Sequence, residues 1–540
     1  MHNTKILISD NLSHGAADML HEAGFGPVFC PDISRSELLE RISDFDVLLV
    51  RSKTRVDAEL LERATRLKVV GRAGAGVDNI DLDTATRRGV LVMNTPGGNS
   101  ISAAEHTVAL LLALARKVPQ ADLSMKQGQW DKKRFEGVEL FGKALGLLGL
   151  GKIGSEVSKR ARAMGMDVIA YDPYISEKFA RDLEVKLVSM EEVLARSDFL
   201  SLHLPLVEET EHLVNDATIK KMKTGIRLLN CARGGLVDEQ ALLRGLNSGK
   251  IAAAALDVFE QEPSPNRELI SHSNIIATPH IAGSTQEAKE KVGFEIVQQV
   301  MEYLRTGVVR NAVNFASISS REFEQIAPYL ELGEKLGGFA GQVSRIRVNE
   351  VGIRYYGELT ELNYKPISSC ILKGVFQAMR IEGVNLINAL SIAKERRIEI
   401  TETSSNRERG FKNLISIQLR NERQMEWVEG ALLHRGNVRL VSVDGIGLES
   451  PLGNFMLFIR NQDQPGVIGQ VGTLLGSNGV NIASFTLGRH EERGEAIGVV
   501  NTDSPVSAEL LKQIQALPAV GFASTVRLDQ KCAYGALGAP

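Results

Sequence analysis

The sequence predicts an α/β protein whose first 316 residues form parallel sheets covered by helices, with separate, more β-rich modules after them. Short apolar runs of strand length alternate with helical segments through this first part, which is the pattern of βα units. After residue 317, alternating strand-like stretches such as RIRVNEVGIRYYGEL replace that pattern. At 540 residues the chain is long enough for several domains, each with its own hydrophobic core.

The stretch 144–172 has the pattern of a strand, a tight turn, a helix and a second strand. An apolar run ends in Gly149, and Gly151 and Gly154 complete the G-x-G-x-x-G spacing where a helix would begin. Glycines at these positions permit the sharp turn, bring the backbone against a pyrophosphate and let the helix lie close to the strand. The helix N-terminus then faces the phosphate charge. The unit therefore predicts dinucleotide binding.

Asp172 ends the second strand of this unit, 21 positions after Gly151. An acidic side chain about 20 residues after the glycines is placed to bind the ribose hydroxyls of the adenosine. A carboxylate there repels a 2′-phosphate, and Pro173 and Tyr174 follow it instead of an arginine. The sequence therefore predicts NAD, and not NADP, as the cofactor.

Charge and cysteine content exclude several classes of protein. The net charge is −3, from 63 basic and 66 acidic residues, so bulk electrostatics predict neither a nucleic-acid nor a membrane partner. No apolar run reaches the ~18 residues of a membrane helix, and the chain opens without a signal sequence. Cys30, Cys231, Cys370 and Cys532 show no C-x-x-C spacing, so no metal site is expected. We expect a soluble cytoplasmic protein.

Two strand ends in the first α/β segment carry basic residues beside small ones. They are Arg51-Ser52-Lys53-Thr54 and Arg72 within GRAGAGVDN. Loops at the carboxyl edge of a parallel sheet are where ligands bind. The first loop offers two cations, a hydroxyl and backbone N–H groups, which together match a phosphate. A solvated polar turn is the alternative.

A long helix is predicted near Ser100, over SAAEHTVALLLALARKVP, and is expected to link two domains. His106 on this helix is expected to be packed or to bridge polar groups, and not to be catalytic. The arm after it, WDKKRF at 130–135, places three cations around two aromatic rings. A solvated charge run and a subunit contact both remain open for this arm.

Four later strand ends carry polar residues. LHLP places His203, NCARGG places Arg233, DVFEQEP places Asp257 and Glu262, and TPHIAGST places His280. Since the carboxyl ends of parallel strands meet at one edge of a sheet, these groups are expected to converge. Histidine titrates near neutral pH and suits proton transfer, so both histidines are candidates for a general base.

Six stretches together resemble the D-isomer-specific 2-hydroxyacid dehydrogenase family. They are GRAGAGVDNID, NTPGGNSISAAEHT, GLLGLGKIG, NCARGGLVDE, AALDVFEQEP and TPHIAGST, in the family's order and spacing. The resemblance covers nearly the whole chain and is strongest to the long, regulated members that oxidise 3-phospho-D-glycerate, the first step of L-serine biosynthesis. The rival readings are a dehydrogenase for an unphosphorylated acid and a transcriptional corepressor of the same fold.

The resemblance implies four domains in a homotetramer. A split, flavodoxin-like substrate-binding domain is expected at 1–97, completed by 285–316. A Rossmann-type NAD-binding domain is inserted at 98–284. An α+β intervening domain follows at 317–452, and a C-terminal ACT domain at 453–530.

The resemblance also implies that Arg233, Glu262 and His280 are catalytic. His280 would take the hydroxyl proton while hydride leaves C2, and Glu262 would orient the imidazole and raise its pKa. Arg233 would bind the substrate carboxylate and polarise the C2 oxygen. His203, the rival base, borders the cofactor in the family.

Further contacts follow from the same resemblance. Those for the cofactor are Gly149, Gly151, Lys152, Ile153, Gly154, Asp172, Cys231, Ala232, Arg233, Asp257, His280 and Gly283. Those for the substrate are Arg51, Ser52, Lys53, Arg72, Gly74, Ala75, Gly76 and Arg233. One cation of the arm, Lys132, Lys133 or Arg134, would reach the substrate of a neighbouring subunit.

An effector site for L-serine is expected in the C-terminal part, and a second cluster of cations is considered. NQDQPGVIGQVGTLLGSNGVNIASF resembles an ACT module, in which Asp463 and Asn481 would hold L-serine between two modules. Asn461 occupies a position where relatives carry histidine or tyrosine, so one contact is expected to be weaker, and a module kept only for assembly is the alternative. Arg407, Arg409 and Lys412 suit an anionic effector or a solvated turn.

Overall fold

The computed structural model describes residues 4–407, 409–433, 436–490 and 494–528. Cys532 and the last two residues of the predicted ACT module, 529–530, lie outside these ranges. The described residues fall into two compact units, Met1–Asn94 with Ile296–Pro540 and Thr95–Glu295. None of the described helices is long and apolar enough to cross a membrane.

The unit Thr95–Glu295 is built on a seven-stranded parallel sheet with the order β12-β11-β10-β9-β6-β7-β8. Its strands are β6 (Ala144–Leu148), β7 (Asp167–Tyr171), β8 (Lys186–Leu187), β9 (Phe199–Leu202), β10 (Ile226–Asn230), β11 (Ile251–Leu256) and β12 (Ile275–Ala277). The strand order reverses between β6 and β9, and the crevice at such a switch point is where ligands bind in open α/β sheets.

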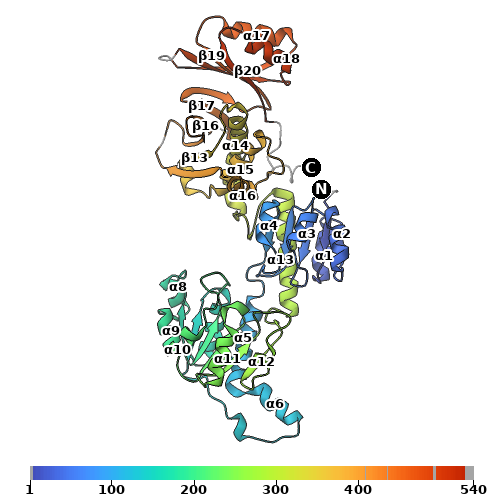
Figure 1. Ribbon diagram of the computed structural model, residues 1–540, viewed down its shortest axis with the longest axis vertical. Helices are drawn as coiled ribbons and strands as arrows, with labels where there is room; N and C mark the ends of the chain where they lie inside the picture. The colour runs from blue at the N-terminus through green and yellow to red at the C-terminus, as the bar shows by residue number, and fades with distance from the viewer. Residues whose placement is uncertain (1–3, 408, 434–435, 491–493, 529–540) are drawn as a thin grey trace. The chain divides into compact units, whose positions relative to one another are not determined.

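Helices cover both faces of the sheet (Figure 1). The unit contains α5 (Ser100–Arg116), α6 (Val118–Lys126), α7 (Lys152–Ala163), α8 (Glu177–Asp182), α9 (Met190–Arg196), α10 (Asp216–Lys221), α11 (Glu239–Asn247) and α12 (Arg267–Ile270), with 3₁₀ turns η2 (Lys133–Phe135) and η3 (Gly234–Leu236). Of these helices, α6 extends away from the sheet (Figure 1). Strands buried on two faces are apolar along their whole length, which explains the short apolar runs of the sequence.

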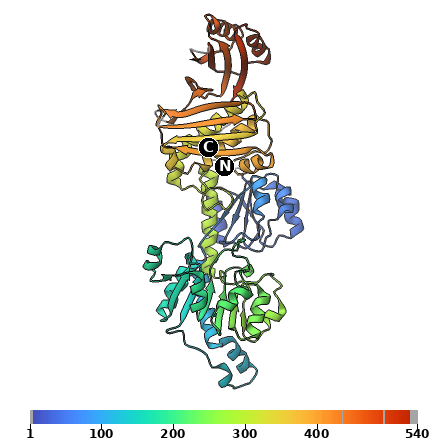
Figure 2. The same ribbon diagram turned by 60° about the vertical axis from the view of Figure 1, so that its left-hand side comes forward.

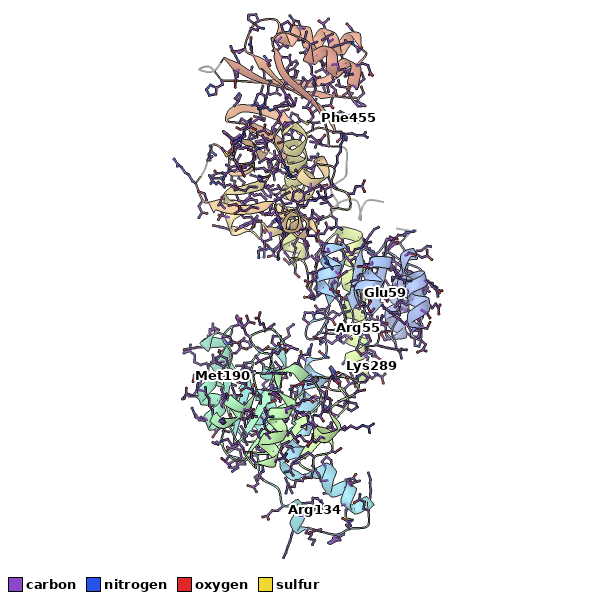
Figure 3. All side chains as sticks on the ribbon, in the orientation of Figure 1. Arg55, Glu59, Arg134, Met190, Lys289 and Phe455 are labelled. Carbon is purple, nitrogen blue, oxygen red and sulfur yellow. The ribbon has the colours of Figure 1, made fainter. Side chains whose placement is uncertain are left out.

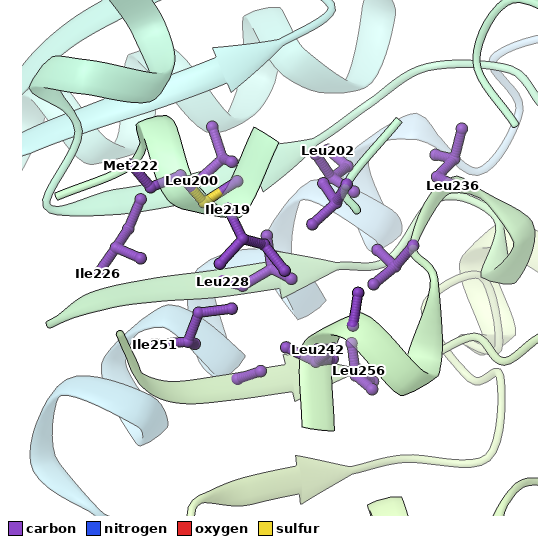
Figure 4. Packing of buried hydrophobic residues seen from close by; sticks show 14 of the residues in the cluster. Leu200, Leu202, Ile219, Met222, Ile226, Leu228, Leu236, Leu242, Ile251 and Leu256 are labelled. Atoms are coloured by element: carbon purple, nitrogen blue, oxygen red, sulfur yellow. The ribbon is translucent and has the colours of Figure 1, made fainter. Parts of the chain in front are cut away.

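A leucine-rich core fixes the ends of β9 and β10. Figure 4 shows Leu200, Leu202 and Leu228 of these strands packing with Ile219 of α10 and Leu242 of α11. All five side chains are at most 5% exposed, and burying each stabilises the fold by roughly 1.5–3 kcal/mol. This packing holds the strand ends, and the loops after them, in fixed positions.

The second unit begins with a five-stranded parallel sheet of order β2-β1-β3-β4-β5. Its elements are β1 (Ile6–Ile8), α1 (His14–Glu22), β2 (Pro27–Phe29), α2 (Arg35–Arg41), η1 (Ile42–Asp44), β3 (Val47–Val50), α3 (Ala58–Arg63), β4 (Val69–Arg72), α4 (Leu82–Arg87) and β5 (Leu91–Asn94). The chain returns to this sheet after the residues of the other unit. Ile296 and Val300, in the second half of α13 (Gln286–Thr306), lie against Gly71 of β4.

Two further sheets complete this unit. The larger has the order β14-β13-β15-β16-β17-β18, and its strands lie side by side in Figure 2, coloured yellow to orange. Its elements are α14 (Ser320–Val343), β13 (Glu350–Gly357), η4 (Glu358–Glu361), α15 (Lys365–Ala378), α16 (Ala389–Glu395), β14 (Glu399–Ser405), β15 (Asn413–Arg420), β16 (Met425–Leu433), β17 (Asn437–Val443) and β18 (Ile446–Pro451).

The last sheet has the order β20-β21-β19-β22 and two helices. Its elements are β19 (Phe455–Gln462), α17 (Val467–Ser477), β20 (Ile482–His490), β21 (Glu495–Thr502), α18 (Ala508–Gln515) and β22 (Val520–Arg527). This βαββαβ order is the one expected of an ACT module. Parallel α/β sheets followed by two β-rich modules confirm the fold class that the sequence predicts.

Candidate active site

The glycine-rich turn between β6 and α7 leaves room for a phosphate. Gly149 has φ of 96°, and a Cβ on it would lie 2.4 Å from the carbonyl oxygen of His203. A Cβ on Gly154 would lie 2.3 Å from the Gly149 carbonyl oxygen. Among the described residues, nothing lies within 4 Å of a Cβ on Gly151, and no side chain caps α7. The first N–H groups of α7 therefore remain open to an anion such as a pyrophosphate.

Asp172, just after β7, lies beside this turn. Its Oδ2 accepts the Leu150 N–H at 2.8 Å, and its Oδ1 accepts the Tyr174 N–H at 2.9 Å. Lys152, in the first turn of α7, donates through Nζ to the Pro96 carbonyl at 2.7 Å. The residues present thus fit NAD, with backbone donors for the pyrophosphate and a carboxylate for the ribose.

Asn230, at the end of β10, shapes the turn that carries Arg233. The fully buried Asn230 accepts the Ala232 N–H at 3.0 Å and donates to the Arg233 carbonyl at 2.8 Å. Arg233 donates through Nη1 to the Ala232 carbonyl at 2.7 Å. Burial raises the pKa of the Cys231 thiol in this turn to about 12, so the thiol is not a nucleophile.

Asp257, at the end of β11, holds the turn that carries His280. The carboxylate is fully buried, and its Oδ1 accepts the Thr278 hydroxyl at 2.6 Å and the Ile281 N–H at 2.9 Å. Its Oδ2 accepts the Ala282 N–H at 2.8 Å. His280 has φ of 52°, a left-handed conformation that is uncommon outside glycine, and its own N–H bonds to the Asp257 carbonyl at 2.9 Å. These bonds stabilise the strained turn.

His106, on α5, lies against the same carboxylate. Its Nε2 is 3.3 Å from Oδ1 of Asp257 and 3.2 Å from the Thr278 hydroxyl. Burial would raise the pKa of Asp257, but the bonds from His106, Thr278 and two backbone N–H groups together lower it below its ordinary value. His106 therefore bridges polar groups, as the sequence suggests.

His280 and Glu262 form a hydrogen-bonded pair. Nδ1 of His280 lies 2.7 Å from Oε2 of Glu262, and Oε1 of Glu262 accepts the Phe259 N–H at 3.0 Å. Glu262 raises the pKa of His280, although burial and the charge of Arg233 oppose this. Because Nδ1 is occupied, Nε2 is the atom left for a substrate. The structure thus brings Arg233, Glu262 and His280 together in one unit.

His203, the rival histidine, has a different environment. Its Nε2 lies 3.0 Å from the Ser201 hydroxyl. Burial lowers the pKa of His203 to about 4, so the ring is neutral near pH 7 and a poor acceptor of a proton. The local chemistry therefore favours His280 as the base.

The predicted phosphate loop, 51–54, belongs to the other unit and is shaped by Asp10. This residue is 1% exposed and accepts N–H groups from Arg51 at 2.6 Å and Thr54 at 3.2 Å. Asn79 donates to the carbonyls of the same two residues, at 2.8 and 2.7 Å. Sequence reasoning missed both Asp10 and Asn79. The one available signal was an acidic residue at the end of the strand-like KILISD.

The two cations of this loop have different surroundings. Burial lowers the pKa of Arg51, although the charge of Asp10 raises it, and its buried Nε has no hydrogen-bond partner among the described residues. Lys53 is mostly exposed and donates to Asp32 at 3.0 Å, while Ser52 is exposed. Arg51 thus offers an unused donor, whereas a phosphate would have to draw Lys53 from Asp32.

The second predicted substrate loop follows β4. Gly74 has φ of 148°, a backbone conformation that favours glycine, and Nη1 of Arg72 lies 1.7 Å from where a Cβ on Gly74 would be. Asn94 donates to the Ala75 carbonyl at 2.6 Å. The loop therefore has a defined conformation with the Arg72 guanidinium beside it. It contains Arg72, Gly74, Ala75 and Gly76.

The predicted effector residues already have partners. Oδ2 of Asp463 accepts a bond from Nε of Arg489 at 2.8 Å, and Nδ2 of Asn481 donates to Asp503 at 2.5 Å. Asn461 is 7% exposed and donates to the neighbouring Gln462 carbonyl. A ligand at Asp463 would share that carboxylate with Arg489.

The remaining basic groups differ in their contacts. Arg409 pairs with Glu429 at 2.9 Å and Lys412 with Glu358 at 2.9 Å, which favours a structural role over an effector site.

Arg134, on the arm after α6, projects from the surface in Figure 3, and its guanidinium lies 5.7 Å from the Phe135 ring. The proposed contact of this arm with another subunit stays a prediction.

Three parts of the chain match models of known families. Residues 108–282 match the NAD-binding domain of D-isomer-specific 2-hydroxyacid dehydrogenases. Residues 325–444 match the D-3-phosphoglycerate dehydrogenase intervening domain. Residues 455–519 match the ACT domain.

Relatives share most of their length with this chain. It is 42% identical to D-3-phosphoglycerate dehydrogenase of Methanocaldococcus jannaschii, covering 97% of this chain and 100% of that one. It is 40% identical to the Bacillus subtilis protein of the same name, covering 95% and 98%.

Solved structures match the first part of the chain. TT0316 protein from Thermus thermophilus is 35% identical with a TM-score of 0.53, covering 57% of this chain and all of that one. D-lactate dehydrogenase from Aquifex aeolicus, complexed with NAD and lactic acid, is 29% identical with a TM-score of 0.51, covering 58% and 100%.

The Glu262 to His280 bond predicts a shift in pH dependence. A base must be neutral to accept a proton, so the acidic limb of kcat/KM for alcohol oxidation should follow the pKa of His280. Glu262→Gln removes the charge that raises this pKa, so the limb should move to lower pH. A pH series with Glu268→Gln, an exposed glutamate on α12, is the control. An unshifted limb in Glu262→Gln contradicts the pairing.

Proposed function

Since the chain belongs to the D-3-phosphoglycerate dehydrogenases of the D-isomer-specific 2-hydroxyacid dehydrogenase family, we propose that Arg233, Glu262 and His280 perform its reaction. The enzyme oxidises 3-phospho-D-glycerate to 3-phosphohydroxypyruvate, a step of L-serine biosynthesis. The observation that carries the proposal is the 2.7 Å bond between Glu262 and His280, which leaves Nε2 of the histidine for the substrate hydroxyl.

Each of the three residues has a separate task. His280 takes the proton of the C2 hydroxyl through Nε2, and Glu262 stabilises the imidazolium that results. The guanidinium of Arg233 binds the substrate carboxylate and polarises the C2 oxygen, which favours the carbonyl product. NAD would supply the acceptor for the hydride that leaves C2. The first turn of α7 and Asp172 would hold its pyrophosphate and ribose.

The loop 51–54 supports a phosphorylated substrate. Nε of Arg51 is a buried donor without a partner among the described residues, and charge-assisted bonds from arginine suit a phosphate. An unphosphorylated acid such as glycerate or lactate would leave this donor without a partner. The ACT module and the complete Arg, Glu and His set favour a regulated enzyme over a corepressor of the same fold.

Loss of the cations in this loop should be selective for the phosphate. In the double variant Arg51→Ala/Lys53→Ala, kcat/KM for 3-phosphoglycerate should fall by at least roughly 10- to 100-fold more than that for glycerate, because the loss of even one charge-assisted bond costs about 1.5–3 kcal/mol. Steady-state rates of NADH formation with both substrates measure this difference. Arg55→Ala, at an exposed position just after this loop, should leave both values unchanged. Equal losses on the two substrates would mean that the loop only supports the fold.

We further propose that L-serine acts at the ACT module of a homotetramer. Asp463 suits the ammonium group of an amino acid, and Asn481 can bond either end of a zwitterion. These side chains already bond to Arg489 and Asp503, so a ligand would have to compete with these two residues or displace them. Weak binding is expected for this reason.

The serine proposal predicts two linked effects. Titration calorimetry with millimolar serine should give binding heat, and serine should lower the rate of 3-phosphoglycerate oxidation. Asp463→Ala should abolish both, whereas Glu509→Ala, on the exposed face of α18, should abolish neither. No heat and no inhibition in the parent enzyme would leave the module with an assembly role only.

A further inference from the structure

Two glutamates bind each other's backbone behind the catalytic loops. The Glu239 N–H donates to Oε1 of Glu260 at 3.1 Å, and the Glu260 N–H donates to Oε1 of Glu239 at 2.9 Å. Glu239 is the first residue of α11, soon after Arg233, and Glu260 lies two positions before Glu262. We call Glu239 and Glu260 the glutamate clamp. It joins the turn of one proposed catalytic residue to the loop of another.

The backbones of the two loops also touch at the clamp. A Cβ on Gly234 would lie 1.9 Å from the Phe259 carbonyl oxygen and 2.7 Å from the Glu260 nitrogen. Only glycine therefore allows this approach. Phe259 in turn donates its N–H to Oε1 of Glu262 at 3.0 Å. The position of these backbone groups thus sets the position of the Glu262 carboxylate.

The buried carboxyl of the clamp lowers the stability of the fold, so stability alone does not explain its presence. Glu239 is 7% exposed, and burial raises the pKa of its carboxyl, to which the charge of Glu260 adds. A buried carboxyl costs free energy that an apolar side chain would not. His212 contacts Glu260, the more exposed residue of the clamp, with its Nε2 3.2 Å from Oε1 of Glu260. The backbone N–H of His212 donates to the Gly235 carbonyl at 2.8 Å. Three loops therefore meet at this pair.

We propose that Glu239 and Glu260 are positioning residues for the dehydrogenase reaction, which fix the Glu262 loop on the Arg233 turn and so hold Glu262 against His280. The inference rests on the proposed roles of Glu262 and His280. The contacts run from Glu239 to the Glu260 N–H, through Phe259 to Oε1 of Glu262, and from Oε2 to Nδ1 of His280.

Kinetics of the full-length enzyme test the clamp. Glu239→Ala should lower kcat for 3-phosphoglycerate about 10- to 100-fold, the range expected when a catalytic group is displaced by up to an ångström. KM for NAD should change far less than kcat, because the proposed pyrophosphate and ribose contacts lie on α7 and after β7. Glu239→Gln should restore most of kcat, since the amide oxygen still accepts the Glu260 N–H. Glu260→Ala, which breaks the clamp from its more exposed side, should reproduce the loss.

A double-mutant cycle separates positioning from general stability. In a Glu262→Ala background, Glu239→Ala should cost almost nothing further, because the clamp acts through the side chain already removed. Glu268→Ala is the matched control and should change neither background. The same fold loss from Glu239→Ala in both backgrounds, or full activity of both clamp variants, would overturn the inference. A Glu262→Ala enzyme as active as the parent would instead overturn the proposed function itself.

Discussion

The buried carboxylate of Asp257 holds the proposed base in a backbone conformation that it would otherwise rarely adopt. The two carboxylate oxygens accept the N–H groups of Ile281 and Ala282, and the backbone carbonyl of Asp257 accepts the N–H of His280. The same device recurs at other strand ends. Asn230 shapes the Arg233 turn, and Asp10 shapes the loop 51–54. Each of these three loops depends on a buried polar side chain at the end of a strand, because buried backbone donors need a partner.

This arrangement explains how far sequence reasoning could go. The strands, the glycine turn and the convergence of Arg233, Glu262 and His280 follow from local patterns, since apolar runs and glycine spacing act within a few residues. The residues that shape the loops could not be found in this way. Asp10 reaches Thr54 across 44 positions, and Glu239 reaches Glu260 across 21. Such contacts depend on the packing of the sheet, which no local pattern encodes.

Ion pairs within the fold also change which charged residues are available to a ligand. Lys53 bonds to Asp32, Asp463 to Arg489 and Arg409 to Glu429. From the sequence each of these looks like a free charge that a ligand could use. The structure shows that a ligand would first compete with an existing pair. The Lys53–Asp32 pair is exposed on both sides, and such pairs are worth only about 0–1 kcal/mol, so this pair can yield to a ligand that offers more bonds. The Arg409–Glu429 pair contains a buried carboxylate and is held more firmly.

The two histidines of the NAD-binding unit give the sharpest contrast, because a carboxylate raises the pKa of His280 while burial lowers that of His203 to about 4. The most direct test of the account is kcat for 3-phosphoglycerate oxidation in His280→Ala and His203→Ala, with NADH binding followed by fluorescence. We expect His280→Ala to lose roughly 10²- to 10⁴-fold in kcat while it still binds NADH, and His203→Ala to keep most of its turnover. A larger loss in His203→Ala than in His280→Ala would contradict the assignment of the base.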